Sequence, residues 1–164
     1  MKKKYYSSGQ TMVEMVVATG MVALVLVAIV AGVALSIRNS RFSRNKAIAT
    51  RYAQETLEKF RALRDEVGWR PFLLDALGNN TDATYCFPTL PDSAIALTGF
   101  LGGCTGQTVT NSAGATEFVR SATSQLSTVD TPNDTVEINV TVSWIEGSKT
   151  HQVLLTSKLN SWEL

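Results

Sequence analysis

A single carboxylate lies at the start of the longest apolar stretch in this chain. Glu14 is followed by 23 residues, Met15 to Ile37, that carry no charge and are mostly Val, Ala, Leu, Met and Ile. As a helix the stretch is roughly 35 Å long, enough to span a hydrocarbon core of about 30 Å. An acid placed in such a segment costs on the order of 3 kcal/mol. We therefore expect Glu14 to have a function and a cationic partner, unless its carboxylate simply reaches the lipid headgroups.

A basic leader and a glycine precede Glu14. The chain begins Met1-Lys2-Lys3-Lys4, and Gly9 lies five residues before the acid, a spacing that Gly20 and Gly32 do not repeat. This combination resembles the N-terminal motif of the type IV prepilins, a family of pilus subunits that also includes the pseudopilins of type II secretion. The segment Ala53-Gln54-Glu55-Thr56-Leu57-Glu58 is similar to the stalk of minor pilins and minor pseudopilins.

The resemblance implies a processing reaction and an assembly role. A membrane peptidase would cut between Gly9 and Gln10 and methylate the new amine of Gln10, which makes Glu14 the fifth residue of the mature chain. In a filament the Glu14 carboxylate would then meet the Gln10 ammonium of a neighbouring subunit. Gln10 departs from the family pattern, in which Phe or Met usually follows the cut.

The same resemblance implies location and partners. The expected protein is a structural subunit, not an enzyme, with its N-terminus inside the inner membrane and its head outside, and it later joins a cell-surface or periplasmic filament. Its partners would be other pilin or pseudopilin subunits, the prepilin peptidase, the inner-membrane assembly platform and the lipid bilayer. No cofactor is implied.

Two other interpretations of the N-terminus stay open. A secretory signal peptide has an apolar region of about 7–15 residues and a small-residue cleavage site; this run is longer, although Ala34-Leu35-Ser36 offers a weak site. The second is a single-pass membrane-anchored binding or enzymatic domain that never polymerises. Only the pilin-like interpretation predicts a mature chain that starts at Gln10.

Helical periodicity continues beyond the apolar run. Apolar and small residues recur at intervals of three and four, which predicts one buried stripe. The residues of this stripe are Ile48, Ala49, Tyr52, Ala53, Thr56, Leu57, Phe60, Leu63 and Val67. No Pro or Gly interrupts the segment, so one helix is expected over residues 10–66, ended by Gly68 with Pro71 just beyond.

The remainder of the chain, from residue 68 on, is predicted to form a β-rich head. Residues 69–114 are predicted to be irregular, with short strands at 83–87 and 94–97. Residues 117–121 and 136–144 are expected to be strands, and 151–159 to return as a hairpin partner after a turn at 146–148. The predicted fold is α+β: a long helix packed against a small antiparallel sheet. The expected divisions are a leader at 1–9, a membrane or filament-core helix at 10–37, a stalk helix at 38–67 and a head at 68–164.

Cys86 and Cys104 are the only cysteines, and both follow the apolar run. An even count in an oxidising compartment favours a disulfide, with two free thiols as the alternative. Their spacing does not suit a redox pair, and zinc would need two further ligands where His151 is the only histidine. His151 is expected to be an exposed strand residue. No catalytic residue and no metal site is predicted.

Charge is divided unevenly along the chain. From Arg38 to Arg64 there are eight basic residues against two acidic ones, whereas from Asp65 onward there are four against eleven. A basic neck and an acidic head could attract each other between subunits. Nucleic acid binding by the neck is possible but not favoured, because the neck has few stacking aromatic residues and no recognisable binding module.

Overall fold

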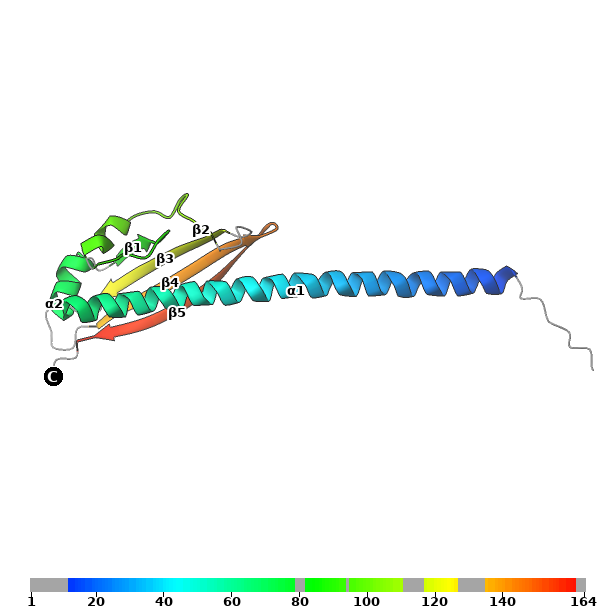
Figure 1. Cartoon of the computed structure of the whole chain (residues 1–164), viewed down its shortest axis with the longest axis horizontal. Coiled ribbons are helices and arrows are strands. Elements are labelled where there is room, and N and C mark those ends of the chain that lie inside the picture. The colour runs from blue at the N-terminus through cyan, green and yellow to red at the C-terminus, as the bar shows by residue number, and fades with distance from the viewer. Residues whose placement is uncertain (1–11, 79–81, 94, 111–116, 127–134, 162–164) are drawn as a thin grey trace, which may run out of the picture. The chain divides into compact units, whose positions relative to one another are not determined.

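The computed structural model describes residues 12–78, 82–93, 95–110, 117–126 and 135–161. The chain divides into two compact units, Met1–Arg41 and Phe42–Leu164. Helix α1 spans Met12–Val67, so the predicted continuous helix is confirmed for the described residues. Its first part lies in the first unit. Its second part belongs to the second unit, where it accompanies a sheet (Figure 1).

The sheet is antiparallel throughout. Its strands are β1 (Asp82–Cys86), β2 (Val109–Thr110), β3 (Glu117–Leu126), β4 (Thr135–Glu146) and β5 (Lys149–Asn160). The order across the sheet is β1-β3-β4-β5, and β2 pairs with β3. The α+β fold class predicted from the sequence is therefore confirmed. Strand β3 runs five residues beyond its expected end, and β2 was not predicted.

The core forms between one face of α1 and one face of the sheet (Figure 1). The predicted stripe is the buried face: Ala49, Ala53, Thr56, Leu57, Phe60 and Leu63 are all buried. Alternate residues of β4 face them, namely Val136, Ile138, Val140, Val142 and Trp144. Ring pairs join the two layers, such as Tyr52 with Phe118 at 5.5 Å and Phe60 with Tyr85 at 6.1 Å between centroids. The stripe thus fixes the sheet to the helix.

Gly68 ends α1 as expected. It adopts a positive φ of 82°, which favours glycine, and its N–H donates to the Arg64 carbonyl at 2.9 Å. Pro71, however, does not end helical structure. It lies in a short helix, α2 (Trp69–Pro71), which runs into a π-helical turn, η1 (Phe72–Ala76).

The prediction of an irregular segment at residues 69–76 is therefore wrong. Proline is tolerated in the first turn of a helix, where its nitrogen needs no intrahelical partner. Phe72, Leu73, Ala76 and Leu77 are buried at helical spacing, and this burial supports the turn.

The strand predicted at residues 94–97 is also wrong. Residue 94 lies outside the described residues, and the following segment is a 3-10 helix, η2 (Ile95–Phe100). The Ser93 hydroxyl accepts a hydrogen bond from the Ala96 N–H at 3.4 Å, which is the arrangement of a helix N-cap. Leu97 is buried, so this turn also contributes to the core.

The disulfide should make a large contribution to the stability of the head. Cys86 and Cys104 are bridged and lie 18 residues apart, and in the chain-entropy model a loop of that size contributes about 3 kcal/mol. We expect reduction of the purified full chain in detergent to lower its melting temperature. Near-ultraviolet circular dichroism monitors the melting. The Cys86→Ala/Cys104→Ala variant should melt at the lower temperature with or without reductant. An unchanged melt after complete reduction would show that the head does not depend on this loop closure.

Candidate functional site

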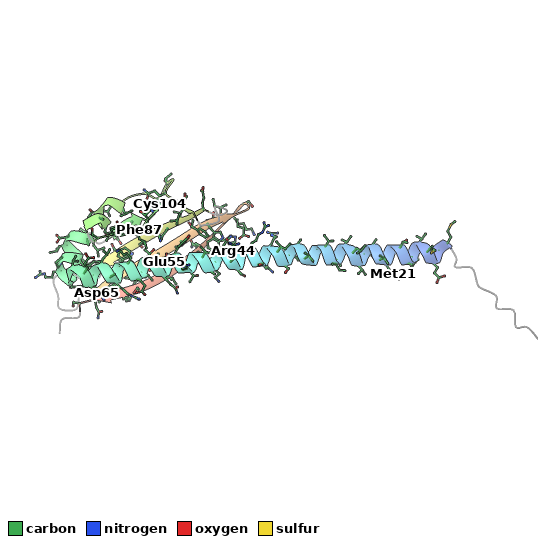
Figure 2. The ribbon with its side chains drawn as sticks, viewed as in Figure 1. Met21, Arg44, Glu55, Asp65, Phe87 and Cys104 are labelled. Carbon is green, nitrogen blue, oxygen red and sulfur yellow. A yellow bond between two sulfur atoms is a disulfide. The ribbon has the colours of Figure 1, made fainter. Side chains whose placement is uncertain are left out.

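The apolar part of α1 presents its side chains outward on all sides. Every Val, Leu, Ile and Met from Met12 to Ile37 is exposed, from 49% at Val17 and Ile37 to 87% at Met12. Figure 2 shows Met21 among the side chains that project from this part of the helix. An amphipathic helix would have a polar face, and this segment has none. In the described part of the chain, this is one helix long and apolar enough to cross a membrane, and it lies near the N-terminus.

Glu14 is in the first turn of α1 and is exposed. A carboxylate is favoured near a helix N-terminus, where the unpaired N–H groups give a partial positive charge. Among the described residues no cationic group pairs with it, and the next charged residue along the chain is Arg38. The predicted cleavage and methylation residues, Gly9 and Gln10, lie outside the described residues.

The predicted disulfide is confirmed. Cys86, at the end of β1, is bridged to Cys104, with 5.2 Å between the two Cα atoms. Gly102, two residues before Cys104, donates its N–H to the Thr84 carbonyl at 3.0 Å, and Leu101 forms a β-bridge with Tyr85. The bridge therefore holds residues 101–104 against β1.

Comparison with family models, with curated proteins and with solved structures finds no match to this chain.

Part of the basic neck is paired within the chain. Arg51 contacts Glu55 at 2.9 Å, Arg61 contacts Glu58 at 2.6 Å, and Arg64 contacts Asp65 at 2.8 Å. Arg44 and Lys46, in the second unit, are exposed and form no ion pair with a described residue. The internal ion pairs of the neck that the structure describes thus lie in its later part, from Arg51 to Arg64.

His151 is not the exposed strand residue that was expected. It is half-buried, with its ring stacked on Trp144 at 5.5 Å and met edge-on by Phe42 at 5.0 Å between centroids. The cause is strand register, because Trp144 and His151 are cross-strand partners in the β4–β5 hairpin. This cluster holds the hairpin end of the sheet to the second unit's part of α1. Among the described residues, no group of His, Cys, Asp and Glu could hold a metal ion.

Arg120 is a structural residue that sequence reasoning missed. Its side chain is only 4% exposed, and its Nε donates to the Phe87 carbonyl at 3.1 Å. Phe87 in turn donates its N–H to the Arg120 carbonyl at 2.9 Å, and the guanidinium lies 5.8 Å from the centre of the Tyr52 ring. Burial lowers the pKa of Arg120, while the charge of Glu55 opposes this shift. The signal was available, since Phe118, Arg120 and Ala122 alternate on the core face of β3.

Arg120 gives a direct test of this packing. We expect Arg120→Ala to lower the free energy of unfolding by about 2–3 kcal/mol, because it removes a charged donor from a buried carbonyl and the packing of the side-chain stem. Arg51→Ala is the matched control, since that ion pair is exposed and such pairs contribute at most about 1 kcal/mol. Urea denaturation of the full chain in detergent measures both. Equal effects from the two substitutions would contradict the role assigned to Arg120.

Proposed function

We propose that this chain is a subunit, and by its short head a minor one, of a type IV pilus or type II secretion-like filament. One observation carries the proposal: a single acid stands at the head of a helix whose next 23 residues carry no charge and whose apolar side chains are exposed. The position of Gly9, five residues before that acid, supports it. So does the fold, in which the later part of α1 packs on an antiparallel sheet.

In this proposal the apolar part of α1 occupies two apolar environments in turn. Before assembly the apolar part of α1 spans the inner membrane, with the N-terminus inside and the head outside. Prepilin peptidase removes residues 1–9 and methylates Gln10, and the assembly platform then transfers the helix into the filament core. In both places the exposed side chains from Met12 to Ile37 are shielded from water.

The electrostatic part of the proposal concerns Glu14 and Gln10. Unit charges about 4 Å apart interact by roughly 4 kcal/mol at an effective dielectric constant near 20. An unpaired carboxylate in lipid would instead tend to take up a proton. Pairing with the Gln10 ammonium of a neighbour would therefore draw the subunit from the membrane into the filament and set its register.

Processing is the first test. Coexpression with a prepilin peptidase should shorten the chain by the nine leader residues, and Gly9→Val should block this because the cut follows Gly9. Gly20→Val is the matched control and should be processed normally, since a side chain at Gly20 meets nothing within 4 Å. Intact mass spectrometry reads both. A mature chain that starts after Ser36, or one that keeps its leader, would favour a signal peptide or a membrane anchor that does not polymerise.

Assembly is the second test. Glu14→Val and Glu14→Gln should insert and be processed, yet enter purified filaments at least about tenfold less often, because roughly 1.4 kcal/mol of the lost pairing already accounts for that factor. Val13→Gln places the same amide one position away and leaves the carboxylate in place, so it is the control. Quantitative immunoblotting of filaments against membranes gives the ratio. Normal incorporation of Glu14→Gln would show that the acid is only an interfacial residue.

A further inference from the structure

Four cations follow the apolar run with no acid among them. The first comes directly after Ile37, and the last is nine residues beyond it. From Met15 to Gln54 the chain contains neither Asp nor Glu, so no neighbour in the sequence balances this charge. We call these four residues the neck cations: Arg38, Arg41, Arg44 and Lys46.

The neck cations are available to an external anion. All four are exposed, and none forms an ion pair with a described residue. The next cation along α1 differs from them, because Arg51 contacts the Glu55 carboxylate at 2.9 Å. A partner for the neck cations must therefore come from outside the described part of the chain.

Helix geometry places the first neck cations at the depth of lipid headgroups. Arg38 and Arg41 belong to the same unit as the apolar run. At about 1.5 Å per residue they lie roughly 1.5 and 6 Å beyond Ile37 along the helix, and the headgroup layer on each side of a bilayer is about 5–8 Å thick. The side chains of a helix also tilt toward its N-terminus, which for residues beyond the run is the direction of the bilayer.

We propose that the neck cations bind the phosphate groups of anionic phospholipids in the leaflet on the side of the head. Guanidinium groups can bind two phosphate oxygens at once, and a basic segment beside a membrane span is attracted to an anionic surface. The inference rests on the membrane span of the proposed function but not on assembly into a filament. It also accounts for an unusual placement, because Lys and Arg are usually scarce on the translocated side of a span.

Nucleic acid offers the same phosphate chemistry, but two observations favour lipid. A bilayer around the apolar run brings headgroup phosphates to Arg38 and Arg41 without any further binding step. Residues 36–46 contain one aromatic residue, Phe42, and its ring packs against His151 at 5.0 Å and Trp144 at 6.1 Å between centroids. The neck thus lacks the free rings on which single-stranded bases stack.

Lipid selectivity tests the proposal on the full chain in phosphatidylcholine vesicles. Spin-labelled phosphatidylglycerol and spin-labelled phosphatidylcholine are added to separate samples, and electron paramagnetic resonance measures the share of each lipid that is held at the protein. We expect the anionic lipid to associate more strongly than the neutral one. This preference should fall as the salt concentration rises, because salt screens the charges.

Two variants assign the preference to the neck cations. The Arg38→Gln/Arg41→Gln/Arg44→Gln/Lys46→Gln variant should lower it by about fivefold or more, which is the factor that even one cation near an anionic surface supplies. Arg51→Gln is the matched control, since it removes an exposed cation of the same helix that is already paired, and it should leave the preference unchanged. Both variants keep the lysines of the leader, so the difference between them isolates the neck.

Insertion is measured first, as resistance to extraction with alkaline carbonate. A wild-type chain that does not insert would overturn both this inference and the membrane span of the proposed function. Insertion with an unchanged lipid preference in the fourfold variant, or an equal loss of preference in Arg51→Gln, would overturn the inference alone. So would a labelled DNA duplex that binds through the neck cations and that phosphatidylglycerol does not displace.

Discussion

The constraint on which this structure depends is the removal of one uninterrupted apolar helical surface from water. From Met15 to Ile37 the chain has no charged residue, and its large side chains are exposed on every side of α1. Transfer of such a side chain from water to an apolar environment is worth about 1.5–3 kcal/mol. Summed over the segment, this transfer free energy exceeds the free energy of unfolding of a typical small domain. By length and composition this part of α1 is apolar enough to cross a membrane.

One helix meets two different requirements along its length. From Met15 to Ile37 its surface is apolar all round, as a membrane or the interior of a helical assembly requires. From Ala49 to Leu63 it buries only one face, and alanines at positions 49 and 53 leave room for the sheet to approach. The second unit thus has a complete core of its own.

Much of this arrangement could be predicted from the sequence because its signals are local. The periodic stripe, the Gly68 stop and the alternation of Val136, Ile138, Val140 and Val142 each depend on neighbours in the chain. The helical turns at residues 69–76 and 95–100 could not be predicted in this way. Their residues are buried because α1 and β1, which are distant in the chain, form the core beside them. Arg120 and His151 were missed for a related reason: strand register decides which side of the sheet a polar residue faces. Of the candidate site residues, the structure describes Glu14 and the two bridged cysteines, whereas Gly9 and Gln10 lie outside the described residues.

Electron paramagnetic resonance of a spin label at Leu24 would show what surrounds the apolar run, because this side chain is 73% exposed in the middle of it. Collision rates with oxygen and with a water-soluble nickel complex report lipid and water around the label. If the run spans the inner membrane and later enters a filament, as proposed, a label in inner membranes should collide often with oxygen and rarely with nickel. In isolated filaments the label should collide rarely with both, as for a site packed among helices. A label that meets water in membranes, or that never appears in filaments, would rule out this proposal.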